Sequence, residues 1–368
     1  MSTFQSLGLP QPIASQLARL QILQPSDIQR QAYQPLSQGR DAWLSAPTGS
    51  GKTLAYLLPL VAKMDLSTTE LQVAVLAPTQ ELAVQIHDCL RQLDASGALG
   101  LRSQLLIGNA SSKRQKEKLK QKPQIVVGSC GRMLELGRSG KLKLHKCQAV
   151  CIDESDTLLA VDQIDDLQAF LKMTPRDRQL VFASATEKGD AFHIAESLGR
   201  QLEWIRGEAI ESGSGIEHCY IESSFHRKPD ALIQFLQSEQ PAKALVFTHR
   251  NATAEDLGQA LEQASIPHSV WHGGMSKFER QRALTQFRTG SAPVLIASDV
   301  AARGMDIKGL SHVINFDLPT LSDDYLHRVG RTGRMGASGR AISIITAEDH
   351  KLIQRYERDL QIRIQERL

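Results

Sequence analysis

Carboxylate side chains gather at the end of one apolar stretch of the sequence. The segment AVCIDESDTLL (149–159) runs from an apolar strand pattern into Asp153, Glu154 and Asp156, with one serine among them. Alone, DESD would be typical of an exposed acidic turn after a strand. Held at the end of a buried strand, so much negative charge requires a compensating cation. A bound metal ion or a nearby lysine would supply it.

A second stretch, APTGSGKT (46–53), approaches the phosphate-binding pattern of Gly, four residues and Gly-Lys-Ser/Thr. Ala46 stands where the first glycine belongs, and the remainder is intact at Thr48, Gly49, Ser50, Gly51, Lys52 and Thr53. The stretch follows the strand pattern AWLSA and opens the helical run LAYLLPLVA, which is the context that this motif requires. In such a loop, backbone N–H groups surround phosphate, the lysine contacts the terminal phosphates and the hydroxyl can hold magnesium.

The two stretches complement each other chemically. In a P-loop protein a second strand ends in an acidic residue that holds magnesium, and Asp153 is placed for this. Glu154 can then orient and deprotonate the attacking water. The metal and Lys52 would hold the negative charge together, so the sequence predicts a Mg²⁺-dependent hydrolase of a nucleoside triphosphate.

Bulk properties limit the possible settings of this site. Hydrophobic residues make up 41% and charged residues 23% of the 368 positions, as in a globular protein. The most apolar run, LAYLLPLVA (54–62), is far shorter than the ~20 residues that span a bilayer. The N-terminus lacks a signal-peptide pattern, and five scattered cysteines without a CxxC pair encode neither a disulfide framework nor a zinc site. We expect a cytoplasmic protein that does not bind membranes.

Charge is nearly balanced, with a net value of +3, so an anionic partner must be met by local patches. The densest charged run is KRQKEKLKQK (113–122). A solvated helix face and a nucleic-acid contact are both compatible with this run.

The chain shows two α/β halves. Strand patterns alternate with helical patterns at AWLSA, QVAVLAP, SQLLIG, QIVVGS, AVCIDE and QLVFASA, and again at HCYIESS, KALVFTH, HSVWHG, VLIASD, HVINFD and GRAISII. This alternation predicts mainly parallel sheets flanked by helices. The segment GEAIESGSGIE (207–217) is rich in Gly, Ser and Glu without periodicity, which is typical of a flexible connection. We therefore predict domains at 1–208 and 217–368, joined by a linker at 209–216.

Ordered motifs along nearly the whole chain resemble those of the DEAD-box RNA helicases of superfamily 2. They are APTGSGKT (46–53), PTQELA (78–83), DESD (153–156), SAT (184–186), ASDVAARGMD (297–306) and HRVGRTGR (327–334), and upstream Phe4 and PSDIQ (25–29) resemble the adenine-reading Q motif. The resemblance implies two tandem RecA-like domains with the active site in the cleft between them. It also implies a monomer that uses ATP and Mg²⁺ to remodel RNA.

The resemblance assigns further residues to the nucleotide. The amide of Gln29 can pair with donor and acceptor edges of adenine, and Phe4 would pack on its face. Asp306 is similarly placed for the ribose. Arg331 and Arg334 resemble arginine fingers that reach the γ-phosphate and stabilise developing charge. Hydrolysis would then require both halves to close on one ATP.

Coupling and RNA contacts are likewise implied by the resemblance. Hydroxyls of Ser184 and Thr186 would hydrogen-bond Asp156, and His327 is a second candidate for coupling. The implied RNA contacts are Thr79, Gly108, Ser129, Gly131, Arg132, Arg280 and Ser298. Small residues and backbone amides let the sugar-phosphate backbone approach closely, so we expect binding with little base readout.

Departures from the family pattern concentrate on the RNA side. DESD replaces DEAD, an exchange that should keep the turn and add a hydroxyl. Gln80 replaces the usual arginine, the paired glycines read Gly108-Asn109, SCGR (129–132) replaces TPGR, and Lys277 replaces a glutamine. Three functions stay open: an RNA helicase or RNA–protein remodelling enzyme, an ATP-gated RNA clamp or assembly scaffold with little unwinding, and a DNA-acting translocase, which the Q motif disfavours.

Overall fold

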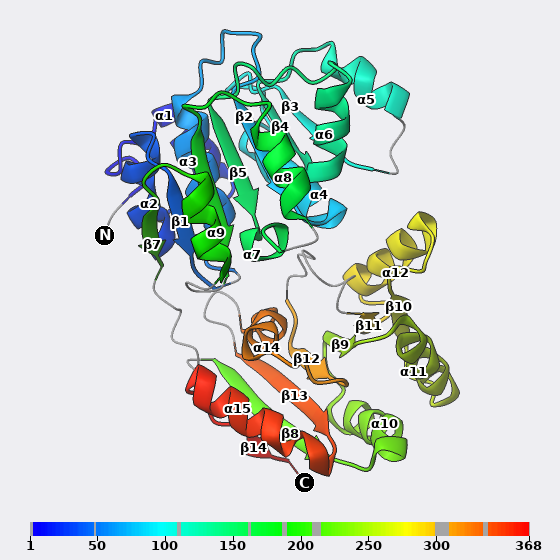
Figure 1. Cartoon of the computed structure of the whole chain (residues 1–368). Coiled ribbons are helices and arrows are strands. Elements are labelled where there is room, and N and C mark those ends of the chain that lie inside the picture. Colours follow the sequence, from blue (N-terminus) through cyan, green and yellow to red (C-terminus); the bar gives the residue numbers. More distant parts are fainter. Residues whose placement is uncertain are drawn as a thin grey trace. The chain divides into compact units, whose positions relative to one another are not determined.

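The chain forms two compact units, Met1–Ala209 and Ile210–Leu368, in a computed structural model. The structure describes residues 3–47, 49–108, 112–160, 163–185, 190–207, 215–298, 309–333 and 338–367. Figure 1 labels the elements of both units, which are described separately here. Most of the predicted linker, 209–216, lies outside the described residues, and the first strand of the second unit begins at Ile216.

The first unit is a seven-stranded parallel sheet in the order β3-β4-β2-β5-β6-β1-β7. Its strands are β1 Ala42–Ser45, β2 Val73–Ala77, β3 Ser103–Leu106, β4 Ile125–Ser129, β5 Ala149–Asp153, β6 Gln179–Ser184 and β7 Glu203–Arg206. Its helices are α1 Gln11–Arg19, α2 Asp27–Ser37, α3 Lys52–Lys63, α4 Gln80–Leu93, α5 Ser112–Leu119, α6 Cys130–Arg138, α7 Ser155–Leu158, α8 Ile164–Leu171 and α9 Asp190–Leu198. Because every pairing is parallel, all carboxyl ends of the strands lie along one edge.

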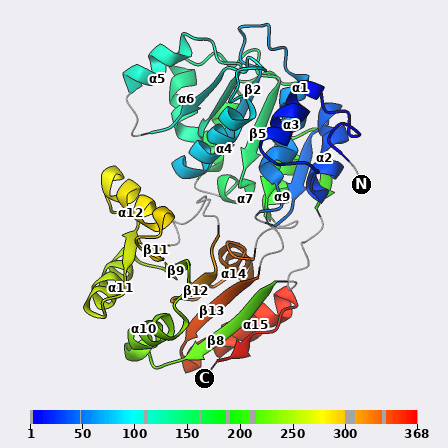
Figure 2. The same cartoon turned by 180° about the vertical axis from the view of Figure 1, so that it is seen from behind.

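Two hydrophobic cores cover the two faces of this sheet. Along β2, Val73 and Val75 pack into one core with α1 to α4, while Ala74 and Leu76 pack into the other with α6, α8 and α9. Strands buried on both faces read as continuous apolar runs, which is why their patterns stand out in the sequence. Figures 1 and 2 show the helices on opposite sides of the sheet.

The second unit repeats this architecture with the strand order β10-β11-β9-β12-β13-β8-β14. Its strands are β8 Ile216–Glu222, β9 Ala244–Thr248, β10 His268–Trp271, β11 Val294–Ser298, β12 His312–Asn315, β13 Gly339–Ile345 and β14 Gln365–Glu366. Its α-helices are α10 Lys228–Glu239, α11 Asn251–Gln263, α12 Lys277–Thr289, α14 Ser322–Val329 and α15 His350–Leu360, with short 3-10 helices at Phe225–Arg227 and Ala347–Asp349. Here too two cores sandwich the sheet, with Val313 in one and Ile314 in the other.

The predicted fold class of two α/β domains with parallel sheets is confirmed. Every predicted strand segment contains a strand, whereas the edge strands β7 and β14 were not predicted. β7 carries an exposed tryptophan and two charged ends, and β14 has only two residues, both exposed. Edge strands have one unpaired side and less buried surface, so their patterns are weaker. Within the described part of the chain, no helix is long and apolar enough to cross a membrane.

Gly128 allows the close approach of β3 and β4. A Cβ atom at this position would collide with the backbone carbonyl of Leu106, its partner in the sheet. Gly128→Ala should therefore destabilise the protein by about 1–3 kcal/mol, as overpacking does. Denaturant unfolding followed by circular dichroism measures this change.

Gly131→Ala is a matched control only three residues away. Gly131 lies in α6, where an added Cβ would meet its nearest neighbour at 3.6 Å, an ordinary contact. Because alanine favours helix more than glycine does, this change should be neutral or stabilising by up to about 1 kcal/mol. Equal stability of the two variants would contradict the assigned strand contact.

Candidate active site

The P-loop connects β1 to α3 at the carboxyl edge of the first sheet. Gly49 and Gly51 have φ angles of 87° and 92°, in the left-handed region that glycine adopts readily. Gly51 caps α3, whose first N–H groups have no acceptor within the helix. A loop of this shape directs backbone N–H groups and a helix N-terminus at one point, which suits an anion. Thr48 lies outside the described residues.

Side chains of the loop also fit a phosphate ligand. Lys52, the first residue of α3, donates from Nζ to the carbonyls of Ala46 and Pro47, the latter at 3.0 Å. The buried Oγ of Ser50 has no hydrogen-bond partner among the described residues, as expected of a group whose partner is a ligand. Thr53 follows Lys52 in the first turn of α3 and is half-buried. These groups fit the triphosphate of ATP.

Asp153 ends β5 with its side chain buried, at 5% exposure. One carboxylate oxygen accepts a hydrogen bond from Tyr56 Oη at 2.8 Å, and the other accepts one from the Glu154 N–H at 2.9 Å. Burial raises the pKa of Asp153, while the Tyr56 hydrogen bond and the charge of Lys52 lower it. A carboxylate held so close to the P-loop lysine fits a Mg²⁺ ligand, whose charge would further favour the ionised form.

Glu154 occupies a strained position between β5 and α7. Its φ and ψ angles are 46° and 52°, a left-handed conformation that is uncommon for residues other than glycine. The following residue stabilises this strained turn. The buried hydroxyl of Ser155 donates a hydrogen bond to the Ala183 carbonyl of β6 at 3.1 Å. The serine of DESD therefore keeps the turn and fixes it to the neighbouring strand. Strain of this kind concentrates at functional sites.

Asp156 continues this turn and contacts the SAT segment. Burial raises its pKa, and a side-chain hydrogen bond from Ser184 and the charge of Lys52 oppose that rise. Ser184 ends β6 and is buried. The expected contact between SAT and DESD thus exists through Ser184, while its role in coupling stays a prediction. Thr186 lies outside the described residues.

The Q-motif glutamine is joined to the P-loop. Gln29, 6% exposed, accepts a hydrogen bond from the Ser26 N–H at 3.0 Å and donates to the Gly51 carbonyl at 3.1 Å. It therefore both caps α2 and fixes the last glycine of the loop. Phe4 is 4% exposed and packs in the core around Leu9. The predicted contacts of Gln29 and Phe4 with adenine stay predictions.

The first unit brings its predicted RNA residues to the same carboxyl edge. Thr79 follows β2 and caps α4 by accepting a hydrogen bond from the Leu82 N–H at 3.2 Å. Gly108 follows β3, Ser129 ends β4, and Gly131 lies in the first turn of α6. A Cβ on Gly108 would lie 3.2 Å from Gln80 Nε2, so Gly108 lies beside the residue that replaces the family's arginine.

Arg132 is more enclosed than a free surface charge. Its side chain is 9% exposed, forms an ion pair with Glu135 at 2.5 Å and donates from Nε to Gln115 at 3.3 Å. These contacts fix the guanidinium between α5 and α6. Binding to RNA at Arg132 would compete with the Glu135 ion pair.

In the second unit the predicted residues come from three segments. Ser298 ends β11. Its buried Oγ, like that of Ser50 in the first unit, has no hydrogen-bond partner among the described residues. Arg280 lies half-buried in the first turn of α12. His327 lies in the last turn of α14 and Arg331 just beyond it, both half-buried. Asp306 and Arg334 lie outside the described residues.

Two residues that the structure singles out were not predicted. Tyr56 lies one turn after Lys52 on α3 and holds Asp153, but in the sequence it is one of several apolar residues. Burial and the charge of Asp153 raise its pKa well above the ordinary value, so it remains a donor. Arg328 is buried, donates to Asn315 at 3.0 Å and lies over the Phe247 ring at 5.1 Å. It is a structural arginine within HRVGRTGR.

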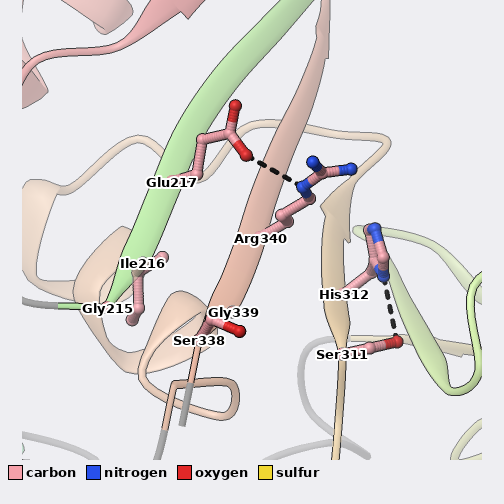
Figure 3. Close-up of a pocket in the computed structure, with 8 residues that line it drawn as sticks. All are labelled: Gly215, Ile216, Glu217, Ser311, His312, Ser338, Gly339 and Arg340. Carbon is pink, nitrogen blue, oxygen red and sulfur yellow. Dashed lines mark hydrogen bonds and ion pairs between the residues drawn. The ribbon is translucent and has the colours of Figure 1, made fainter. Parts of the chain in front are cut away.

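A pocket of about 600 Å³ opens where β8, β12 and β13 begin (Figure 3). Arg340 and Glu217 form an ion pair at 2.8 Å on its wall, and His312 contacts Ser311 at 2.9 Å. None of the predicted site residues lines this pocket. Its polar groups are mostly paired with one another, so the candidate active site is at the P-loop.

Both halves of the chain match known family models. Residues 26–192 match the DEAD/DEAH box helicase model, and residues 227–336 match the helicase conserved C-terminal domain. The DEAD-box ATP-dependent RNA helicase CshC of Bacillus cereus is 39% identical over 337 residues, covering 92% of this chain and 86% of that protein. The probable ATP-dependent RNA helicase YfmL of Bacillus subtilis is 34% identical over 343 residues, covering 93% and 90%.

Solved structures show the same relationship. Dbp5 of S. cerevisiae, bound to RNA and ADP BeF3, superposes with a TM-score of 0.91 at 27% identity, covering 100% of this chain and 96% of that chain. A DEAD box protein from the hyperthermophile Methanococcus jannaschii gives a TM-score of 0.58 at 28% identity, covering 100% and 99%. With the P-loop, the DESD turn and the tandem sheets, these matches show that the chain belongs to the DEAD-box family of ATP-dependent RNA helicases.

Proposed function

We propose that this helicase binds ATP and Mg²⁺ at the carboxyl edge of the first sheet and couples hydrolysis to local opening of RNA duplexes. The observation that carries the proposal is the convergence of Lys52, Asp153 and Glu154 at one edge. The charge of Lys52 lowers the pKa of both Asp153 and Asp156, so these two carboxylates lie within electrostatic reach of the lysine, and Glu154 lies between them in the DESD turn. A relative of the same fold is bound to RNA and ADP BeF3.

Each residue has a separate task in this proposal. Lys52 and the loop N–H groups bind the terminal phosphates, and Thr53 and Asp153 hold Mg²⁺, which would neutralise charge developing on those phosphates. Glu154 accepts the proton of the attacking water. Arg331 and Arg334, from the second unit, stabilise the charge that develops on the transferred phosphate, so hydrolysis requires both units.

RNA would bind chiefly through its sugar-phosphate backbone. The first unit contributes loop residues at the ends of β2, β3 and β4, and the second unit contributes Arg280 and Ser298. The buried, unpartnered Oγ of Ser298 supports a phosphate contact there. We place the protein in the cytoplasm, which the free thiols of all five cysteines support.

An ATP-gated RNA clamp is the second candidate function. Gln80, which replaces the usual arginine beside Gly108, and the ion-paired Arg132 favour it, because both weaken contacts on the RNA side. Steady-state ATPase with and without single-stranded RNA, combined with duplex unwinding, separates the two functions. RNA-stimulated ATPase with unwinding supports the helicase, and stimulation without unwinding supports the clamp.

Glu154→Gln should slow hydrolysis by about 10²–10⁴-fold, because it removes the proposed base while keeping size and hydrogen bonding. ATP affinity, measured by fluorescence titration, should stay within a few-fold of wild type. Glu262→Gln is a control, since it removes an exposed carboxylate in the last turn of α11 and should leave turnover unchanged. If Glu154→Gln turned over ATP at the wild-type rate, Glu154 would not be the general base.

Tyr56→Phe should shift the acid limb of the kcat/KM profile to higher pH. The Tyr56 hydrogen bond lowers the pKa of Asp153, so its loss raises that pKa and delays ionisation as pH rises. A hydrogen bond to a charged group corresponds to a shift of about one to two pH units. Tyr33→Phe is the control, because Tyr33 donates to the Gly8 carbonyl instead. If Tyr56→Phe and wild type had identical acid limbs, Tyr56 would not be a positioning residue for Asp153.

Arg331→Ala should remove most RNA-stimulated turnover, because arginine fingers contribute about 10³–10⁵-fold in rate. ATP affinity should change little, since the binding loop belongs to the first unit. Arg288→Ala, an exposed arginine in the last turn of α12, is the matched control. RNA-stimulated rates that are equal in the two variants would contradict the role of the second unit.

A further inference from the structure

A cleft of about 830 Å³ lies in the first unit, at the edge of the sheet from which β2 and β4 begin. Three segments line it: residues 69–71 before β2, one face of α5 with the chain through Pro123, and residues 140–143 between α6 and β5. None of the residues assigned to the nucleotide or RNA lines it. The cleft is therefore a separate feature of the domain.

Lysine dominates the charge of this cleft. Its cationic lining consists of Lys113, Lys116, Lys120, Lys122, Lys141 and Lys143, against two glutamates. One of these glutamates, Glu117, forms an ion pair with Lys120 at 2.9 Å. Five of the six lysines are exposed and Lys116 is half-buried. Such a cleft attracts an extended anion.

The lysines of α5 are presented by an anchored helix. Lys113 and Lys116 are three residues apart on α5 and share one face, and Lys120 directly follows the last residue of the helix. Gln115 anchors a different face: its Nε2 donates to the Ile107 carbonyl at 2.8 Å, and its own carbonyl accepts from Gln104 at 2.9 Å. The hydrogen bonds of Gln115 therefore fix the orientation of α5 and, with it, the direction of its lysine face.

The position of α5 connects the cleft to the RNA-facing edge. α5 begins four residues after Gly108 and leads to Pro123, just before β4 starts. The five residues of β4 separate the two edges by ~17 Å. Both views show α5 beside α6 at the periphery of the unit (Figures 1 and 2).

We propose that this lysine cleft binds the phosphate backbone of RNA that flanks the segment held by the carboxyl-edge loops. The inference rests on the proposed function. Lysines act as point charges without the fixed fork of arginine, so they hold phosphates without reading bases. RNA is favoured over an acidic protein segment because α5 joins the cleft directly to the Gly108 loop. The charged run of α5 then extends the grip of the helicase on longer RNA.

The test compares two RNA lengths on the full chain with a non-hydrolysable ATP analogue. One RNA is the shortest single strand that fully stimulates the ATPase, and the other is the same strand extended at either end. The cleft variant is Lys116→Gln/Lys141→Gln, which changes both walls. The matched control is Lys146→Gln/Lys172→Gln, two exposed lysines of the same unit outside the lining.

Fluorescence anisotropy should show that wild type and control bind the extended strand more tightly than the short one. The cleft variant should lose this gain while binding the short strand normally and keeping its stimulated ATPase. For the extended strand, its slope of log Kobs against log salt should be shallower by about 1.4, because each lost phosphate contact on a single strand contributes about 0.7.

Three results would overturn the proposal. Equal affinity and equal salt slope of the cleft and control variants on the extended strand would show that the cleft does not bind RNA. Binding of poly-glutamate that depends on Lys116 and Lys141, without loss of RNA affinity, would identify an acidic protein as the occupant. Absence of wild-type binding to the short strand would refute the proposed function itself, and with it the cleft's role.

Discussion

The buried charge of Asp153 is the constraint on which the first unit depends. β5 lies inside the sheet between β2 and β6, so the carboxylate at its end has little access to water. A buried carboxylate is tolerated only when hydrogen bonds and opposite charge offset its desolvation. Tyr56, the Glu154 N–H and the charge of Lys52 provide this. The P-loop helix and the acidic strand are thereby held together before any nucleotide arrives.

Short hydrogen-bonded links extend from this point through the unit. Gln29 joins α2 to the Gly51 carbonyl, so the Q motif fixes the P-loop. On the other side, the hydroxyl of Ser155 fixes the DESD turn to β6, and Ser184 of β6 contacts Asp156. The hydrogen bonds of Gln29 and Ser155 are each 3.1 Å long and join α2 and β6 to the phosphate site. They give a physical basis for the coupling that the family resemblance implies.

Much of the fold was predictable because parallel strands covered on both faces must be apolar along their whole length. The edge strands β7 and β14 lack that requirement and were missed. Candidate site residues that belong to local motifs, such as Lys52 and Asp153, were predicted from type and spacing, and their roles stay predictions. Tyr56 and Arg328 were not, because a tyrosine in an apolar helix and an arginine in a basic motif give no signal of what they touch.

The sequence by itself determined the two α/β halves, the P-loop and the position of the acidic turn, because each depends on neighbours within a few residues. Tertiary structure alone decided which carboxylate is buried, which serine fixes the turn to β6, and that Arg132 is paired with Glu135. It also decided that the lysines of α5 face those of residues 140–143 across one cleft. Such contacts join residues far apart in the chain, and strand order, which local patterns do not encode, brings them together.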